Sequence, residues 1–356
     1  MATTETVVVK IGTSSVTTST GEIDHEVLAS LASDVTVLRS RGYRVVVVTS
    51  GAITAGWADV GAHRERPRDA VTLQAVSAVG QPLLMQAWRA AFAPSAPVGQ
   101  VLLAPLDFAH RAQYLHARAT INALCDLGVV PIVNENDAVA DEEIRYGDND
   151  RLAALVANLV TAQMLVLLTD TAGLLTADPS LDPHATLIEE VTAIDRELEA
   201  IAGSSSGAVG SGGMSSKLAA ARIATWSGVE TVIAPARSQR PLLSVLERTP
   251  GVGTRFRARS ERLSARKAWI AFAAPSRGRL SVNEGAVVAL LRDGRSLLRV
   301  GVLSSRGTYD EGDAVEIVDE RGELVAKGLA RTSSDAHEHA DDLCVHRDDL
   351  VVLRSA

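Results

Sequence analysis

Short runs of β-branched and aliphatic residues alternate along the first 235 residues with longer amphipathic segments. The short runs predict buried strands at Thr6–Ile11, Arg44–Thr49, Val98–Leu103, Val129–Val133, Met164–Leu168 and Thr231–Ala234. The longer segments carry apolar residues at helical spacing and predict helices over 24–41, 70–92, 111–127, 152–161 and 214–227. Gly80 and Pro82 lie inside the second of these helices, where we expect a break or kink.

Strands that alternate with helices form parallel βαβ units. The fold class expected here is therefore α/β, with an open, mostly parallel sheet sandwiched by helices. Ligands of such sheets bind outside the carboxyl ends of the strands. Polar loops follow Lys10, Thr49, Val133 and Leu168, each at the end of an expected strand, so we expect these loops at one edge of the sheet.

The pattern changes after about residue 255. Arg255–Lys267 is rich in arginine and is typical of a linker or exposed connector. Short β-type runs separated by glycine-containing turns then predict a small all-β domain. These runs are Val287–Leu291, Leu297–Val302, Ala314–Asp319 and Leu324–Ala330. We expect an α/β domain over residues 1–257, a linker over 258–275 and a β domain over 276–356.

Composition narrows the class of protein. A net charge of −8 and a pI near 5.5 argue against non-specific binding to nucleic acid or anionic membranes as the main activity. The two cysteines, Cys125 and Cys344, are far apart, so neither a zinc site nor a disulfide framework is indicated. Neither a signal peptide nor a membrane-length apolar run is found, and we expect a cytoplasmic protein.

Lysine is rare in this chain. Of 35 basic residues, four are lysines, and two of them, Lys10 and Lys217, lie where Gly/Ser/Thr loops join regular elements. Lysine carries a compact charge on a flexible stem, whereas arginine is a rigid fork. We interpret these two positions as places that need a point charge, although four lysines are few enough for chance to produce the pattern.

A glycine- and serine-rich loop leads into a helix over Val209–Ala224. Glycines let backbone N–H groups converge, and the start of a helix adds further donors and a partial positive charge. The junction therefore suits a phosphate, with Lys217 in the first turns of the helix. The alternative is a flexible hinge before an ordinary helix.

Three polar stretches follow expected strands or precede an expected helix. Val133–Val139 places Asn134 and Asp137 after a strand, although turns favour Asn and Asp in any case. Asp148, Asn149 and Asp150 precede an apolar helix, which one of them could simply cap. Thr169 and Asp170 end a strand before a loop that suits a nucleotide base and ribose, or that is merely a surface loop.

The sequence lacks a Gly-x-Ser-x-Gly nucleophile elbow, a His-Glu-x-x-His motif and a Cys/His metal cluster. Phosphoryl transfer to a carboxylate fits this absence, because a carboxylate with a pKa of about 4.3 is already an ionised nucleophile at neutral pH. The obstacle is then repulsion between two anions. Two lysines, backbone donors and Mg²⁺ would overcome that repulsion.

Six motifs occur in order: Val-Val-Val-Lys-Ile-Gly-Thr-Ser, Val-Thr-Ser-Gly-Ala-Ile, Val-Asn-Glu-Asn-Asp-Ala-Val, Gly-Asp-Asn-Asp, Leu-Leu-Thr-Asp and Gly-Gly-Met-Ser-Ser-Lys. Together they resemble the glutamate 5-kinase family of the amino acid kinase superfamily, over residues 6–257. The C-terminal part is similar to a PUA domain and ends in Val-His-Arg-Asp-Asp at 345–349. The sequence departs from the family pattern at Leu175, where tyrosine is expected.

The resemblance implies ATP-dependent phosphorylation of the L-glutamate γ-carboxylate, the first step of proline biosynthesis. It implies catalytic roles for Lys10 and Lys217, which would stabilise the transferring phosphoryl group, and for Asp150, which would orient them. Glutamate would be bound by Ser50, Gly51, Asn134, Asp137, Asp148 and Asn149. ATP would be bound by Lys10, Thr169, Asp170, Ser211, Gly212, Gly213, Met214, Ser215, Ser216 and Lys217.

The resemblance also implies Mg²⁺ held mainly by the phosphates without a protein ligand, feedback inhibition by proline, and a homo-oligomer. Two other functions stay open. PUA domains often occur in RNA-binding or RNA-modifying proteins, but residues 276–356 carry fifteen acidic against eleven basic side chains and aromatic residues are scarce. The third possibility is a kinase for another acidic metabolite, such as N-acetylglutamate or aspartate.

Overall fold

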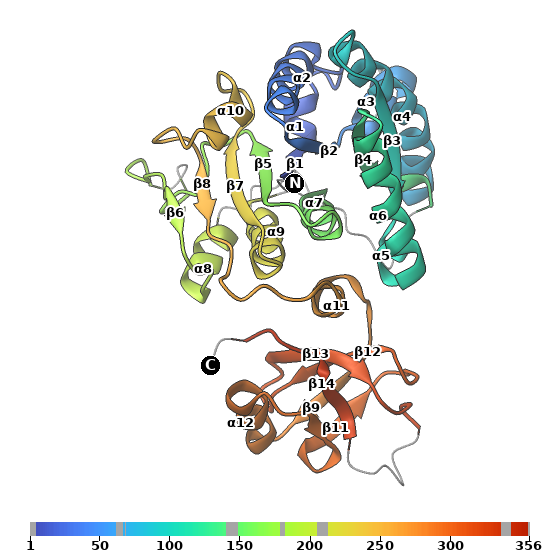
Figure 1. Cartoon of the computed structure of the whole chain (residues 1–356), viewed down its shortest axis with the longest axis vertical. Helices are drawn as coiled ribbons and strands as arrows, with labels where there is room; N and C mark the ends of the chain where they lie inside the picture. Colours follow the sequence, from blue (N-terminus) through green and yellow to red (C-terminus); the bar gives the residue numbers. More distant parts are fainter. Residues whose placement is uncertain are drawn as a thin grey trace. The chain divides into compact units, whose positions relative to one another are not determined.

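The computed structural model describes residues 5–61, 67, 69–139, 149–178, 182–204, 213–335 and 343–354. The chain gathers into two compact units, one made of Met1–Asp107 and Arg111–Arg262 and the other of Phe108–His110 and Leu263–Ala356 (Figure 1). Among the described residues, no helix is both long and apolar enough to cross a membrane.

The first unit is built on a sheet that has eight strands among the described residues. Neighbours from β3 to β7 pair in parallel, β8 runs antiparallel to β7, and β6 pairs in parallel with β8. This confirms the expected open, mostly parallel sheet. In spatial order the strands are β3 (Val98–Leu103), β4 (Val130–Glu135), β2 (Arg44–Val48), β1 (Thr6–Ile11), β5 (Met164–Thr169), β7 (Glu230–Pro235), β8 (Thr254–Phe256) and β6 (Glu190–Val191).

Helices join and cover these strands (Figure 1). Their bounds are α1 (Thr13–Val16), α2 (His25–Ser40), α3 (Ala52–Gly61), α4 (Ala70–Phe92), α5 (Pro105–Ala109), α6 (Arg111–Asp126), the 3-10 turn η1 (Asp137–Val139), α7 (Asn149–Leu159), α8 (Arg196–Ser204), α9 (Met214–Trp226) and α10 (Pro241–Leu246). Asp24 caps α2, because its carboxylate accepts a hydrogen bond from the Val27 N–H. The break expected at Gly80 and Pro82 is wrong, since α4 runs through both residues.

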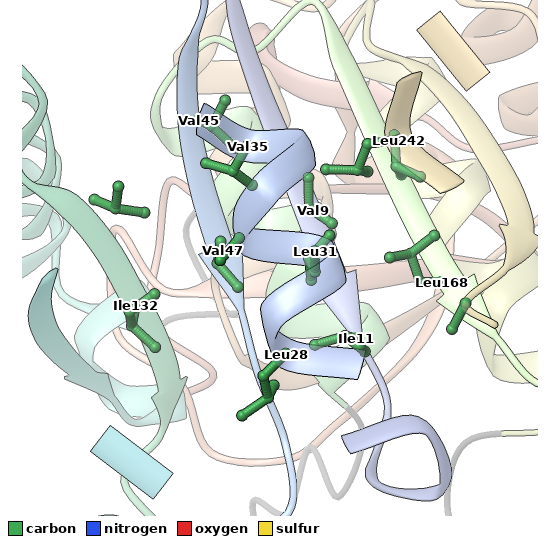
Figure 2. Close-up of a cluster of buried hydrophobic side chains, with 14 of the residues drawn as sticks. Val9, Ile11, Leu28, Leu31, Val35, Val45, Val47, Ile132, Leu168 and Leu242 are labelled. Atoms are coloured by element: carbon green, nitrogen blue, oxygen red, sulfur yellow. The ribbon is translucent and has the colours of Figure 1, made fainter. Parts of the chain in front are cut away.

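Alternation along β1 decides what each face of the sheet carries. Val7, Val9 and Ile11 lie on the face covered by α2, and they join a core that includes residues of α4 and α10. Figure 2 shows Val9 and Ile11 close to Leu31 of α2. Lys10 alternates with these residues and therefore points to the opposite face, where α7 packs against β1. An apolar strand can thus bury its core side chains and still deliver one charged side chain at its carboxyl end.

On that second face, α7 and α9 pack against each other and against the central strands. Every residue of α7 from Leu152 to Leu159 is buried. A short helix that is apolar all round is stable only inside a protein. The sequence predicted this helix from Leu152, and the structure begins it three residues earlier, at Asn149.

The second unit contains a mixed sheet in the order β10-β14-β13-β12-β9-β11. Most neighbouring strands of this sheet pair antiparallel, which confirms the expected small β domain. Its elements are α11 (Ala265–Ala268), the π-helical turn η3 (Trp269–Ala273), β9 (Ser276–Val282), α12 (Glu284–Asp293), β10 (Leu297–Leu298), η4 (Arg299–Gly301), β11 (Val302–Arg306), β12 (Ala314–Val318), β13 (Leu324–Ala330) and β14 (Leu343–Val352).

Three expectations about this part of the chain are wrong. Leu297–Val302 is not one strand, because the 3-10 turn η4 separates β10 from β11. Val287–Leu291 is not a strand but part of α12, which Asn283 caps through the Ala286 N–H and which ends at Gly294 in the left-handed conformation. The segment that begins at Arg255 is not wholly a connector either. Arg255 lies in β8, and its guanidinium is 2.6 Å from the Glu230 carboxylate of β7.

Candidate active site

Three charged side chains from three elements meet next to the carboxyl end of β1. Lys10 Nζ lies 2.6 Å from Asp150 Oδ1, and Lys217 Nζ lies 3.1 Å from Asp150 Oδ2. Lys10 comes from β1, Asp150 from the first turn of α7, and Lys217 from the first turn of α9. Asp150 is fully buried, and the two lysines are 4% and 6% exposed. The structure therefore brings together the three residues to which the sequence assigned catalysis.

The charge of Asp150 follows from its neighbours. Burial alone raises the pKa of a carboxyl group, but the ammonium groups of Lys10 and Lys217 outweigh burial here and hold the pKa of Asp150 below its ordinary value of 3.8. The carboxylate is therefore ionised at neutral pH. The three residues sum to one net positive charge, which favours an anionic ligand. With an ammonium group against each oxygen, Asp150 is suited to orienting amines and is a poor base.

Local backbone geometry leaves room around the lysines. A Cβ at Gly12, two residues after Lys10, would lie 3.3 Å from Lys10 Nζ. On the other side, Gly213 has an extended backbone at the start of α9, and no side chain among the described residues caps the helix. The early N–H groups of a helix lack partners within the helix, and they suit a phosphate. The loop–helix junction predicted from the sequence is therefore present from Gly213 onward.

The residues predicted to bind the substrate glutamate lie beside this cluster. Asn149 Nδ2 lies 2.6 Å from the Thr49 carbonyl oxygen, 2.7 Å from Ser50 Oγ and 2.9 Å from Asn134 Oδ1. These contacts join the ends of β2 and β4 to the first residue of α7. Asp137 lies three residues after Asn134, in η1. Asp148 lies outside the described residues.

Gly51 follows Ser50 with a φ of +103°, in the region that only glycine adopts without strain. A Cβ at this position would also lie 2.7 Å from Val16 Cγ2 in α1. The backbone after β2 can therefore turn tightly against α1 only because residue 51 is glycine. This turn places the Gly51 backbone at the edge of the sheet, next to the residues that are predicted to bind the substrate glutamate.

The residues predicted to bind ATP lie at the end of β5 and at the start of α9. Thr169 ends β5, the neighbour of β1, and its hydroxyl lies 3.1 Å from Asp170 Oδ1. Gly213, Met214, Ser215 and Ser216 begin α9, and Ser216 Oγ lies 3.4 Å from Asp150 Oδ2. Ser211 and Gly212 lie outside the described residues.

Sequence reasoning missed the contribution of α4. Ser77 Oγ donates to Asp137 Oδ2 at 2.8 Å, Gln81 Nε2 to the Glu135 carbonyl oxygen at 3.3 Å, and Trp88 Nε1 to Thr49 Oγ1 at 3.2 Å. These three residues are buried. The available signal was a serine and a glutamine four residues apart inside an otherwise apolar helix.

The described side chains do not form a metal site of their own, since no three His, Cys, Asp or Glu residues among them lie close enough to hold an ion. Asp150 is unsuited to binding Mg²⁺ because both of its oxygens face ammonium groups.

Comparison with known proteins shows which family the chain resembles. The amino acid kinase family model matches residues 5–235, and the PUA domain model matches residues 278–345. A glutamate 5-kinase of Vibrio vulnificus is 43% identical over 98% of this chain and 96% of its own length. A glutamate 5-kinase of Burkholderia mallei is 44% identical over 92% of this chain and 88% of its own length.

Among solved structures, a carbamate kinase from Giardia lamblia bound to AMP-PNP is similar in fold, with a TM-score of 0.51 and 20% identity over 73% of this chain and all of that one. The likeness shows that the first unit has the fold of this kinase class. The near full-length relatives narrow the assignment further. The chain belongs to the glutamate 5-kinase family of amino acid kinases and carries a PUA domain in its C-terminal part.

Proposed function

We propose that this chain transfers the γ-phosphoryl group of ATP to the γ-carboxylate of L-glutamate and so forms L-glutamate 5-phosphate, the first step of proline biosynthesis. The observation that carries the chemical part of this proposal is the buried cluster in which Asp150 holds the ammonium groups of Lys10 and Lys217. The family assignment supports the identity of the substrate, because the near full-length relatives are glutamate 5-kinases.

The reaction needs charge neutralisation more than it needs acid–base chemistry. A γ-carboxylate oxygen attacks the γ-phosphorus, the new O–P bond forms, and the bond to the β-phosphate oxygen breaks to release ADP. No proton moves, since the nucleophile is already ionised. Lys10 and Lys217 would stabilise the charge on the transferring phosphoryl group, and Asp150 would keep both ammonium groups in place throughout the reaction.

Glutamate would bind at the ends of β2 and β4. Its ammonium group would pair with the Asp137 carboxylate. Ser50 and Asn149 would contact the substrate directly, with Asn134 and Asp148 as neighbours and the Gly51 N–H as a further donor. The hydrogen bonds from Asn149 to Ser50 and Asn134 support this assignment, because they join the polar groups into one preorganised surface.

ATP would bind across β5 and the start of α9. Thr169 and Asp170 would face the base and ribose, and Ser211–Lys217 would hold the phosphates through backbone donors and the Lys217 ammonium. Mg²⁺ would arrive with ATP, held mainly by phosphate oxygens, and would screen their charge. The extended Gly213 and the start of α9, which no described side chain caps, support the phosphate assignment.

The remaining expectations complete the proposal. Residues 1–257 would form the kinase domain, 258–275 the linker and 276–356 the PUA domain. The protein would work in the cytoplasm as a homo-oligomer, with proline as feedback inhibitor and without membrane or nucleic-acid partners.

A substrate panel with coupled detection of ADP tests the assignment. Glutamate is expected to give a higher kcat/KM than aspartate or N-acetylglutamate. For N-acetylglutamate the reason is that it has no free ammonium group to pair with Asp137. Faster ADP release with aspartate or N-acetylglutamate would instead assign the chain to a different acidic metabolite.

A further inference from the structure

One face of α4 points three hydrogen-bond donors at the glutamate side of the site. Ser77, Gln81 and Trp88 are separated by four and seven residues, so a helix of 3.6 residues per turn places them on the same face. Each donates to a residue at the end of β2 or β4 or in η1. Ser77 and Gln81 lie on either side of Gly80 in the sequence, so one short stretch of α4 is hydrogen-bonded to the segment that follows β4.

Ser77 makes the most specific of these contacts. Its hydroxyl donates to Asp137 Oδ2 at 2.8 Å, and the serine is 1% exposed. A hydrogen bond from a buried, fixed hydroxyl to a carboxylate is stronger than one between neutral groups. It also restricts the rotation of the Asp137 carboxylate, because one of its oxygens is hydrogen-bonded to a buried side chain of α4.

Gln81 fixes the backbone on which Asp137 is mounted. Its Nε2 donates to the Glu135 carbonyl oxygen at 3.3 Å, and its Oε1 accepts from Gln100 Nε2 at 3.0 Å. The two partners determine which end of the amide faces Glu135. The segment from Glu135 to Asp137 is therefore held at both its main chain and its terminal carboxylate by one helix.

The helix approaches closely enough for these bonds because of glycine. A Cβ at Gly80 would lie 1.8 Å from the Ala52 carbonyl oxygen, in the first turn of α3. Ala52 directly follows Ser50 and Gly51, which are assigned to glutamate. The contact that brings Ser77 within reach of Asp137 thus also sets the position of the loop after β2.

We propose that Ser77 is a positioning residue for glutamate, acting through Asp137. It holds the Asp137 carboxylate in the orientation that receives the substrate ammonium group, and so it contributes to the selection of an amino acid over a simple dicarboxylic acid. This inference rests on the proposed function, since it takes Asp137 as the partner of the glutamate ammonium. Ser77 is not one of the residues proposed to hold the phosphoryl group or the nucleotide.

The test is steady-state kinetics of Ser77→Ala with Ser40→Ala as matched control. Ser40 is exposed on α2, and its hydroxyl donates a hydrogen bond to the Val37 carbonyl oxygen. Ser77→Ala is expected to raise the KM for glutamate about tenfold, the size of a lost hydrogen bond to a charged group. Its kcat and its KM for ATP are expected to match those of Ser40→Ala. Its melting temperature is expected to be lower than that of Ser40→Ala, because a buried hydrogen bond to a carboxylate is lost, but the protein stays folded at the assay temperature.

A double-mutant cycle with Asp137→Asn separates positioning from packing. Glutamate affinity is measured by calorimetry, which does not depend on turnover. If Ser77 acts through Asp137, Ser77→Ala weakens binding in the wild type but changes it less than twofold in Asp137→Asn. Equal losses in both backgrounds, an unchanged KM for glutamate, or a parallel rise in the KM for ATP would each overturn the proposal. Failure of wild type to phosphorylate glutamate would instead overturn the proposed function.

Discussion

Lys10 Nζ lies 2.6 Å from Asp150 Oδ1, and this buried ion pair joins the central strand β1 to the first turn of α7. The pair is completed by Lys217 from α9, so a single carboxylate sets the separation of two ammonium groups. Preorganised positive charge of this kind stabilises a phosphoryl group during transfer without reorganisation at the moment of reaction. The position of Asp150 therefore determines whether both lysines can act on one ligand.

Replacing Asp150 by asparagine tests that role. An amide cannot neutralise two ammonium groups, so the lysines should repel each other and leave their positions. We expect Asp150→Asn to lower kcat by at least about 100-fold, measured by coupled ADP release. Glu199→Gln is the control, because it removes the carboxylate of an exposed ion pair with Arg222 on α9. Its kcat should equal that of wild type, and a comparable kcat in Asp150→Asn would contradict the assigned role.

The lowered pKa of Asp150 also predicts a pH dependence of stability. The folded protein favours the ionised carboxylate more than the unfolded chain does, so this contribution is full above the ordinary value of 3.8 and is lost as the pH falls through the folded pKa. The free energy of unfolding of wild type, minus that of Asp150→Asn, should be constant from pH 8 to about pH 5. It should shrink below pH 3.8. Denaturant titrations at each pH measure it, and a difference that grows on acidification would contradict the assignment.

Gly80 predicts the stability cost of separating α3 from α4. A methyl group there would overlap the Ala52 carbonyl oxygen, so the two helices would have to move apart. Gly80→Ala should lower the free energy of unfolding by about 1–3 kcal/mol, as overpacking does elsewhere. Gly203→Ala in α8 is the control, since nothing lies within 4 Å of its added Cβ. That variant should be neutral or stabilised by about 0.5–1 kcal/mol, and equal effects at both sites would refute the packing explanation.

Asp34 predicts a second stability effect, far from the chemistry. This buried carboxylate of α2 accepts hydrogen bonds from the Leu242 N–H at 2.9 Å and the Leu243 N–H at 3.4 Å, at the start of α10. Asp34→Ala would leave both donors without this acceptor, so we expect a loss of about 1–3 kcal/mol in the free energy of unfolding. Chemical denaturation measures the loss, and kcat at a temperature well below melting should not change.

The pattern of apolar residues predicted the first unit well because its central strands are buried on both faces. Thr6–Ile11 and Met164–Leu168 are near-continuous aliphatic runs, and such runs have few alternative structures. The same signal failed at Val287–Leu291. A half-buried helix and a short strand look alike over five residues, and the Asn283 cap and Gly294 stop were the features that distinguish them.

The charged part of the site was predictable for a different reason. Lys10, Asp150 and Lys217 stand beside glycine-rich or polar loops at the ends of strands or starts of helices, where chemistry on a parallel sheet is expected. Ser77 and Gln81 lie in the middle of a helix, and no local rule makes a mid-helix serine functional. Their importance depends on a close approach of α4 to η1, which is a property of the tertiary structure.

The most direct measurement is the single-turnover rate of Lys217→Ala at saturating ATP and glutamate, with the acyl phosphate trapped by hydroxylamine. If two ammonium groups held by Asp150 stabilise the transferring phosphoryl group, the rate should fall at least about 100-fold. The circular dichroism spectrum and a cooperative melting transition should show that the variant is still folded. A folded Lys217→Ala protein that turns over within a few-fold of the wild-type rate would contradict the mechanism.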